Sequence, residues 1–270
     1  FLLQDKNYEI KCLSNNKEKN IGKTEKNFFH LNFEKKEDIQ KLLDENQIPD
    51  IFIHLGWGGM RNPHSIEHVK SNIKSSKNLI EILFKAGLKK FIFLGSMTEY
   101  GDRSGSLLEE MPSQGTLANY ARGKKEVAVF GFENAKITKN YFIHIRLSYV
   151  YGPIIRKDSL IQTLFEGHQR KSDVFVGSCQ QFRDYIHVSE AVEGIKRICN
   201  INQSVTINLG SGKSIKLRDF VELFWKYLGG ESKKLHFDSE PHNSNEQPQP
   251  NCYVDLKKLK DFTNWSPTLS

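Results

Sequence analysis

Hydrophobic residues along the chain recur with two different periods. Short runs rich in β-branched and aromatic residues, each bounded by polar residues or glycine, predict buried β-strands. These runs occupy residues 8–13, 27–31, 50–56, 90–96 and 141–152. Two of the segments between them, 34–47 and 65–87, instead carry apolar side chains at helical spacing, and Gly87 marks the end of the second one. The pattern therefore predicts strands alternating with helices.

Single helices between strands imply parallel strand pairs with right-handed crossovers. We therefore expect an α/β fold with an open, doubly wound parallel sheet, whose ligand binds outside the carboxyl ends of the strands. Two of these ends stand out. The run 50–56 leads into Gly56, Gly58 and Gly59, which either let backbone approach a ligand or make a tight turn without one. The run 90–96 ends at Ser96, with Thr98 close behind.

Composition narrows the classes of function. The chain has 270 residues, of which 38% are hydrophobic, enough for one large domain or for a main domain with a smaller appendage. No run approaches the roughly 18 apolar residues of a membrane span, and the first residues become polar too soon for a signal peptide. The four cysteines are far apart and lack metal-ligand spacing, which fits free thiols in a reducing cytoplasm. We expect a cytoplasmic protein without a membrane segment or a bound metal.

The formal net charge of +7 bears on the choice of partner. The lysines are scattered among Asn and Glu residues, and no basic run is interleaved with aromatic residues. Nucleic acid is therefore not the expected partner, and an anionic small molecule fits this charge at least as well.

Candidate chemistry centres on the segment NYARGK, residues 119–124. On a helix, Tyr120 and Lys124 would lie one above the other, so that the ammonium could lower the pKa of the phenol. The same spacing also describes an ordinary solvated helix surface. Ser96 could reach the same reacting oxygen as the phenol. Two hydroxyls and an ammonium at one point suit proton transfer to a carbonyl that is reduced by hydride, or from an alcohol that is oxidised.

Four motifs follow one another along the chain: GSMTEYG at 95–101, YARGK at 120–124, RLSYVYGP at 146–153 and FRDYIHVSEAV at 182–192. In this order they resemble the extended short-chain dehydrogenase/reductases that modify nucleotide sugars. The resemblance extends from about the first residue to the last. It implies a Rossmann-type dinucleotide-binding domain over 1–152 and a smaller, mainly substrate-binding domain over 153–270, from which some segments return to the Rossmann sheet. It also implies a nucleotide-sugar substrate and a homodimer, with helices at 65–87 and 113–132 as the candidate interface.

The resemblance assigns roles by position. It implies that Tyr120 is the catalytic acid/base, that Lys124 binds the nicotinamide ribose and that Ser96 hydrogen-bonds the reacting oxygen. On the substrate side it points to Thr98, Tyr149 and Arg183. Arg183 matches an arginine that grips the substrate diphosphate, and an ion pair with Asp184 is the alternative. The remaining family residues, expected to shape the fold rather than to touch substrate, are Arg146, Asp184, Tyr185 and His187.

The cofactor side departs from the family pattern. The glycine-rich turn after the first strand is absent, and we expect the natural chain to begin about 20 residues or more upstream. Small polar groups and a cation after the second strand favour NADP(H) over NAD(H), unless these lysines are simply solvated. The expected cofactor contacts are Ser14, Asn15, Asn16, Lys17, Leu55, Gly56, Tyr120 and Lys124. His30 stands where the family often has an adenine-contacting Asp.

The residues beside Ser96 bear on the reaction. Related 4,6-dehydratases carry an Asp-Glu pair where this chain has Met97 and Thr98, so dehydration is not expected. The favoured reaction is NADPH-dependent reduction of the C4 ketone of a nucleotide-linked 4-keto-6-deoxyhexose. An NAD-dependent 4-epimerase is the alternative, although Tyr149 stands where epimerases commonly place an asparagine. A non-catalytic scaffold is the second alternative, favoured by the absent glycine-rich turn and opposed by the intact Ser96, Tyr120, Lys124 and Arg183.

Overall fold

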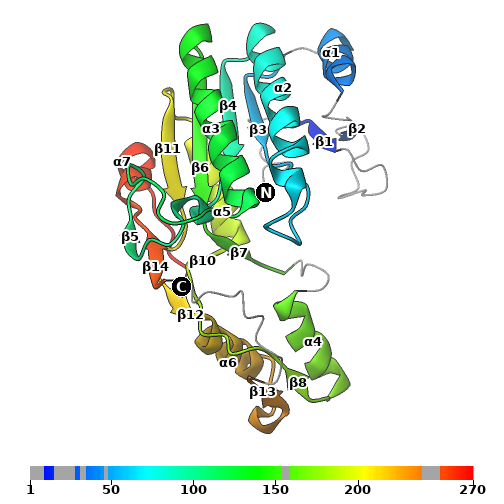
Figure 1. The fold of residues 1–270 in the computed structure, drawn as a ribbon, viewed down its shortest axis with the longest axis vertical. Coiled ribbons are helices and arrows are strands. Elements are labelled where there is room, and N and C mark those ends of the chain that lie inside the picture. Colours follow the sequence, from blue (N-terminus) through cyan, green and yellow to red (C-terminus); the bar gives the residue numbers. More distant parts are fainter. Residues whose placement is uncertain are drawn as a thin grey trace.

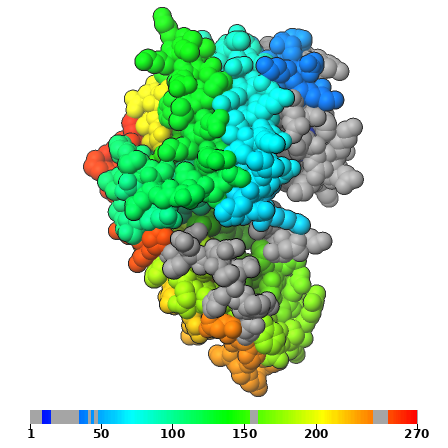
Figure 2. Space-filling view, in the orientation of Figure 1, coloured from blue at the N-terminus to red at the C-terminus, as the bar shows by residue number. Residues whose placement is uncertain are grey.

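The computed structural model describes residues 9–14, 28–30, 35–45, 48–153, 159–238 and 250–269. Its upper part contains a sheet between helices, and a smaller group of helices and short strands lies below (Figure 1). The space-filling view shows an indentation between the cyan residues of the upper part and the light-green residues of the lower part (Figure 2).

A four-stranded parallel sheet forms the centre of the upper part, in the order β11-β6-β4-β3. Its strands are β3 (Ile51–His54), β4 (Lys90–Leu94), β6 (Tyr141–Leu147) and β11 (Val205–Leu209). Side chains alternate between the two faces of a strand, so Phe91 and Phe93 of β4 enter one hydrophobic cluster while Ile92 enters the other. Residues 90–93 are all buried, as expected for a strand covered on both faces.

Helices cover both faces of this sheet (Figure 1). Helices α2 (Ser71–Lys85) and α3 (Asn119–Thr138) pack on one face, where Leu79 and Val127 meet the phenylalanines of β4 and β6. Helices α5 (Val188–Ile198) and α7 (Lys257–Thr263) pack on the other, around Ile195 and Leu259. This arrangement confirms the predicted doubly wound α/β fold.

The strand predictions are confirmed with shorter strands, the first of which ends one residue beyond its predicted run. β1 (Cys12–Ser14) and β2 (Phe28–His30) pair in parallel as a separate two-stranded sheet, followed by α1 (Lys36–Glu45). The single run predicted at 141–152 contains two strands, β6 and β7 (Tyr149–Tyr151). They separate because β7 leaves the main sheet and pairs with β10 (Tyr185–His187). The N–H of Tyr149 donates to the carbonyl of Asp184 at 3.0 Å.

The helix predictions need two corrections. The pattern at 65–87 contains a 3₁₀ turn, η3 (Ile66–His68), before α2 begins at Ser71. The helix expected at 113–132 instead spans 119–138 as α3. It starts later because the backbone of Gln114 bonds to that of Tyr100 and Asp102, each at 3.0 Å, and is therefore not available to a helix. Tyr120 consequently lies in the first turn of α3.

The lower part has its own small core. Helices α4 (Leu160–Arg170) and α6 (Leu217–Tyr227) enclose Leu164, Val221 and Trp225 together with β8 (Val174–Phe175). The other short elements are η5 (Ser232–Lys234), β13 (Leu235–His236), β9 (Phe182–Arg183), β12 (Ile215–Lys216), β5 (Gly105–Leu107) and β14 (Cys252–Val254). β13 pairs with β8, β12 with β9 and β14 with β5. Residues after 153 thus contribute to both parts, because α5, β11 and α7 belong to the upper layers.

Candidate active site

Ser96 lies immediately beyond the carboxyl end of β4, where it starts the 3₁₀ turn η4 (Met97–Tyr100). Its hydroxyl oxygen accepts hydrogen bonds from the N–H of Thr98 at 3.2 Å and from the hydroxyl of Thr98 at 2.9 Å. Its backbone N–H donates to Oε1 of Glu99 at 2.8 Å, which completes a capping box. Ser96 is only 8% exposed. The turn therefore holds both its backbone and its side chain.

Tyr120 approaches Ser96 from α3, close enough for the Ser96 hydroxyl to act on the pKa of the phenol. The phenol ring lies edge-on to the rings of Trp57 and His68, with centroids 6.3 and 5.4 Å away. Burial raises the pKa of Tyr120 to about 12, and the neighbouring Ser96 hydroxyl only partly opposes this. The sequence had suggested a lowered phenol pKa. In this structure it is raised because burial outweighs the groups that favour the phenolate.

Lys124 is almost completely buried, one turn along α3 from Tyr120. Its Nζ donates to the carbonyl oxygen of Leu94 at 2.6 Å, at the end of β4. The ammonium lies 4.2 Å from the ring centroid of Trp57, 5.0 Å from that of Phe93 and 5.8 Å from that of Tyr120. Such aromatic faces attract a cation. Burial nevertheless lowers the pKa of Lys124 to about 7, with the charge of Glu99 acting in the opposite direction.

Sequence reasoning missed the side chains that support this helix from the β3 side. Trp57 Nε1 donates to Nδ1 of His68 at 3.0 Å, and the other His68 nitrogen bonds to the carbonyl oxygen of Asn62 at 2.9 Å. Asn72 bonds to both the N–H and the carbonyl of Gly58. The sequence held one signal of this contact, the glycine beside Lys124. A Cβ on Gly123 would lie 2.4 Å from the carbonyl oxygen of His68, so α3 comes close to η3 only with a glycine there.

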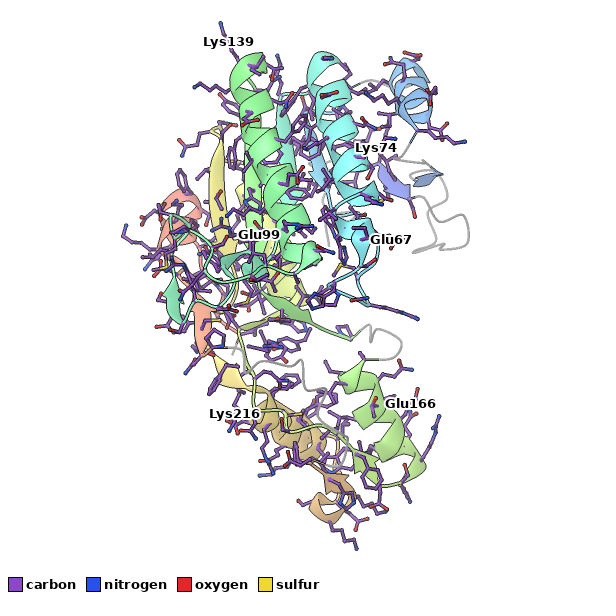
Figure 3. All side chains as sticks on the ribbon, in the orientation of Figure 1. Glu67, Lys74, Glu99, Lys139, Glu166 and Lys216 are labelled. Carbon is purple, nitrogen blue, oxygen red and sulfur yellow. The ribbon has the colours of Figure 1, made fainter. Side chains whose placement is uncertain are left out.

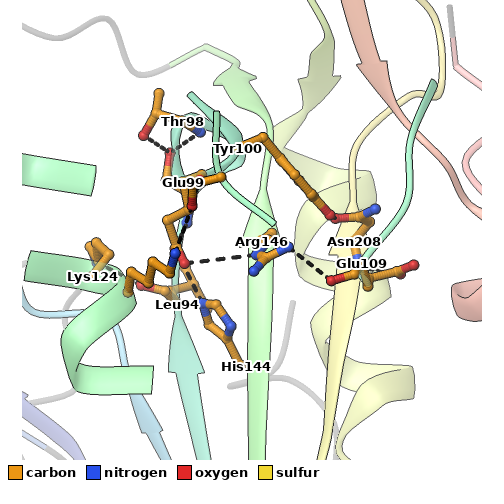
Figure 4. A network of polar contacts seen from close by, with 12 residues as sticks. Leu94, Thr98, Glu99, Tyr100, Glu109, Lys124, His144, Arg146 and Asn208 are labelled. Carbon is orange, nitrogen blue, oxygen red and sulfur yellow. Dashed lines mark hydrogen bonds and ion pairs between the residues drawn. The ribbon is translucent and has the colours of Figure 1, made fainter. Parts of the chain in front are cut away.

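A buried polar network lies behind Ser96 (Figure 4). Glu99 Oε1 lies 3.2 Å from Nε2 of His144, and Oε2 lies 3.7 Å from Nε of Arg146. The pKa of Glu99 is lowered because, although burial acts to raise it, His144, Arg146 and the N–H of Ser96 together favour the carboxylate. Arg146 also lies over the ring of Tyr100 and donates to the carbonyl of Glu109 at 3.1 Å. These contacts suit the structural role expected of Arg146.

Arg183 of β9 and Tyr149 of β7 lie together. The guanidinium carbon of Arg183 lies 4.7 Å from the ring centroid of Tyr149, and Nη1 donates to the carbonyl of Phe182 at 2.9 Å. Tyr149 is also close enough to Tyr120 for its phenolate charge to act on the pKa of Tyr120. The structure thus brings Tyr149, which is expected to contact substrate, near Tyr120, the expected catalytic acid/base.

Asp184 has structural partners. Its two carboxylate oxygens accept hydrogen bonds from the N–H and hydroxyl of Ser211 at 2.7 and 2.8 Å, and from the N–H groups of Gly212 and Val254 at 3.2 and 3.1 Å. Asp184 thereby ties β10 to the loop after β11 and to β14. His187 caps α5, since its Nδ1 accepts from the N–H of Ser189. Both residues shape the turn, as the sequence suggested.

The residues expected at the cofactor divide between described and undescribed segments. Leu55 and Gly56 follow β3 at the same edge as Ser96, and the Leu55 side chain is 59% exposed. Ser14 is the last residue of β1, whereas Asn15, Asn16 and Lys17 lie outside the described residues. His30 ends β2, and its side chain also lies outside the description.

Two kinds of site are not found in the described part of the chain. No three His, Cys, Asp or Glu side chains there are grouped so that they could hold a metal ion. No helix there is long and apolar enough to cross a membrane.

The chain also matches the model of a known protein family. The model of the NAD dependent epimerase/dehydratase family matches residues 2–210. The chain belongs to this family. The expected resemblance to the nucleotide-sugar dehydrogenase/reductases is thereby confirmed at the level of the family.

Three characterised or named relatives match at low identity. An uncharacterized UDP-glucose epimerase of Bacillus subtilis is 25% identical over 240 residues, covering 82% of this chain and 70% of that protein. A UDP-glucuronate 4-epimerase of Thermodesulfobacterium geofontis is 25% identical over 206 residues, covering 75% and 62%. A CDP-abequose synthase of Salmonella muenchen is 23% identical over 203 residues, covering 73% and 66%.

Solved structures show the same fold. A UDP-glucose 4-epimerase from Thermotoga maritima, solved with UDP-glucose, has a TM-score of 0.82 at 20% identity and covers 96% of this chain and 85% of that one. RMD from Pseudomonas aeruginosa, solved with NADPH, has a TM-score of 0.76 at 18% identity and covers 93% and 88%. At these identities the likeness concerns the fold.

Proposed function

We propose that this protein reduces the C4 ketone of a nucleotide-linked 4-keto-6-deoxyhexose with NADPH. The observation that carries the proposal is the close approach of Ser96 and Tyr120, with buried Lys124 beside them, at the carboxyl edge of a parallel sheet. Ligands of such sheets bind at this edge.

The residues at this edge fit a nicotinamide cofactor. The exposed Leu55 offers an apolar contact, Gly56 leaves backbone accessible, and the Tyr120 hydroxyl and Lys124 ammonium supply donors suited to a ribose. RMD, which has this fold, binds NADPH. A bound NADPH would supply the hydride, which reaches C4 while the carbonyl oxygen takes a proton.

That proton comes from Tyr120 in the proposed mechanism. A serine oxygen has two acceptor positions and one donor. Because Thr98 occupies both acceptor positions of Ser96, the Ser96 proton is directed to Tyr120 or to the ketone oxygen that takes its place. Ser96 then stabilises the charge that develops on the ketone oxygen, while Tyr120 protonates it. The resulting phenolate is stabilised by the Lys124 ammonium and regains a proton from water.

On the substrate side, Arg183 is proposed to bind the diphosphate, with Tyr149 beneath its guanidinium. A planar guanidinium suits two phosphate oxygens at once, and the ring of Tyr149 at 4.7 Å limits the directions that it can adopt. The segments after residue 153 that form the lower part are proposed to hold the nucleotide, as in the two-domain division expected from the sequence.

This arrangement lacks the additional acid and base that elimination of water requires. The positions where dehydratases carry an Asp-Glu pair hold Met97 and Thr98. Met97 packs in a hydrophobic cluster with Tyr100 and Leu107, and Thr98 is bonded to Ser96. The nearby carboxylate of Glu99 faces away into the buried network and so is not placed to remove a substrate proton.

A 4-epimerase is the second candidate function, because two of the named relatives are described as epimerases. Such an enzyme would use the same Ser96, Tyr120 and Lys124 but keep its cofactor bound through both half reactions. Tyr149, in place of the asparagine common in epimerases, supports the reductase instead.

The test is a cofactor titration followed by a turnover assay. NADPH and NADH are titrated in parallel by fluorescence, and dTDP-, CDP- and UDP-linked 4-keto-6-deoxyhexoses are then added while NADPH absorbance is followed. We expect preferred NADPH binding and oxidation with one of these sugars. Tyr120→Phe should lower kcat about 100-fold or more, while Tyr227→Phe, at an exposed position on α6, should not change it.

The other outcomes separate the alternatives. Tight NAD binding, with interconversion of 4-epimeric sugar nucleotides and no net NADPH consumption, would establish the epimerase. When the protein is expressed from its complete reading frame, failure to bind either dinucleotide would contradict both enzymatic proposals and leave the scaffold.

A further inference from the structure

Glu99 is a buried carboxylate directly behind the proposed catalytic residues. It is 1% exposed and lies inside the upper part of the molecule, whereas Lys139 projects from the end of α3 (Figure 3). Figure 4 shows its two oxygens turned toward different partners. Oε1 accepts from the N–H of Ser96 and meets His144, while Oε2 faces Arg146.

The charge of Glu99 is only partly compensated. Among the described residues, neither Oε2 of Glu99 nor Nε of Arg146 has a hydrogen-bond partner, and they face each other at 3.7 Å. Burying an ionised carboxylate costs free energy unless it is paired and hydrogen-bonded, so the presence of Glu99 at this position needs an explanation. Where water is excluded, its remaining charge acts over several ångströms.

That charge reaches α3. The carboxylate of Glu99 favours the ammonium form of Lys124 and disfavours the phenolate form of Tyr120. Two further titratable groups near Lys124 are neutral near pH 7. They are His54 of β3, whose pKa is lowered to about 3 by burial and then by the charge of Lys124, and the phenol of Tyr120. Glu99 of η4 therefore supplies the negative charge that offsets the burial of Lys124.

We propose that Glu99 is a positioning residue with two tasks: it fixes the backbone of Ser96 and keeps Lys124 in its ammonium form. The first task rests on the 2.8 Å capping bond, which sets where the Ser96 hydroxyl points. The second rests on the burial of both charged groups near the end of β4, where Lys124 bonds to Leu94 (Figure 4). The consequences for turnover rest on the proposed function, whereas the effect on Lys124 is a property of the protein alone.

Glu99→Gln tests the charge, since it keeps the size of the side chain and an acceptor for Ser96. The titration of Lys124 is followed by NMR with ¹³Cε- and ¹⁵Nζ-labelled lysine, and Lys124→Met identifies the signal. In Glu99→Gln the midpoint should move lower by about one pH unit, because an opposing charge is lost. Above the lowered midpoint, about tenfold fewer molecules of Glu99→Gln carry Lys124 as ammonium. The kcat of ketone reduction at such a pH should therefore fall about tenfold relative to the wild type.

The chain offers a matched control in Glu109. It is also buried, and its Oε1 accepts from the N–H of Asn208 at 2.8 Å, on the opposite side of Arg146 from Glu99. Glu109→Gln should leave the Lys124 midpoint in place. Glu99→Asp keeps the charge but draws it back from Ser96, so it should lower kcat while the Lys124 midpoint stays near its natural value.

An unchanged midpoint in Glu99→Gln, or equal changes in the two Gln variants, would overturn the proposal. If Glu99→Gln did not fold, Arg146→Met would replace it. Loss of that cation leaves Glu99 less compensated, so the Lys124 midpoint should rise, and a fall or no change would refute the charge role. The NMR titration needs neither cofactor nor sugar. An absence of reductase turnover would therefore count against the proposed function and leave this inference standing.

Discussion

At the scale of single residues, Lys124 differs from what its spacing suggests. Four residues after Tyr120 on a helix, its ammonium was expected against the phenol. Instead Nζ bonds to the carbonyl of Leu94 and lies between the rings of Trp57 and Phe93, closer to both than to the ring of Tyr120. The carbonyl oxygen at the end of β4 thus holds the ammonium. Lys124 links α3 to the strand that carries Ser96.

The buried Lys124 should make stability depend on pH. Its pKa falls from 10.5 to about 7 on folding, so between these values the unfolded chain binds one proton more than the folded chain. Stability therefore rises with pH across this window, and below about pH 7 the cost of burying the ammonium is fully present. The unfolding free energy of the wild type, relative to that of Lys124→Met, should increase by about 2 kcal/mol from pH 7 to 9. Urea unfolding at both pH values measures this.

Lys139→Met is the control for that measurement, because Lys139 is exposed at the end of α3. The difference in unfolding free energy between Lys139→Met and the wild type should be the same at both pH values. A constant difference for Lys124→Met as well would show that the folded protein holds Lys124 with an ordinary pKa.

At the scale of elements, the sequence predicted best what depends on neighbours along the chain. The apolar runs of β3 and β4 and the periodicity of α2 are local signals, and the structure has all three elements. The break between β6 and β7 at Ser148 and the late start of α3 were not predicted, because each depends on a backbone partner far away in the sequence. Asp184 draws β7 away from the sheet, and Tyr100 occupies the backbone of Gln114.

The same distinction applies to the site. Ser96, Tyr120 and Lys124 were expected together from their motifs, and the structure brings them together. The supporting residues Trp57 and His68 gave no local pattern, because their contacts join segments far apart in the sequence. The cofactor segment Asn15, Asn16 and Lys17 remains a prediction, since it lies outside the described residues.

The contact between α3 and η3 should be sensitive to one added methyl group. Gly123→Ala favours the helix intrinsically, but its Cβ would lie 2.4 Å from the His68 carbonyl oxygen and must push α3 away. We expect a net loss of about 2 kcal/mol in the free energy of unfolding, with reduced turnover because Tyr120 moves from Ser96. Urea unfolding followed by tryptophan fluorescence measures the first effect. Gly177→Ala, with no atom within 4 Å of the added Cβ, should lose far less, and equal losses would contradict the packing argument.

At the scale of the whole molecule, the expected chemistry and the expected substrate contacts come from different parts. Ser96 and Tyr120 belong to the sheet and its helix, whereas Arg183 belongs to β9, which pairs with β12 just before α6 of the lower part. The lower part has its own core around Leu164 and Trp225. Two cores joined near the site allow each side to be changed in evolution without rebuilding the other, which suits a family whose relatives differ in sugar nucleotide.

The family resemblance leads us to expect a homodimer formed through α2 and α3. These helices lie side by side on one face of the sheet (Figure 1). Val129 and Ile137 of α3 are 51% and 78% exposed, and a two-fold interface would cover such apolar side chains with their own copies. We predict a dimer by size-exclusion chromatography with light scattering, and a shift to monomer in Val129→Glu, because facing carboxylates would repel each other across the two-fold axis. Leu223→Glu, at a 63% exposed position on α6 far from this face, should remain dimeric. A wild-type monomer would refute the expectation. If Val129→Glu remained dimeric, the interface would lie elsewhere on the molecule.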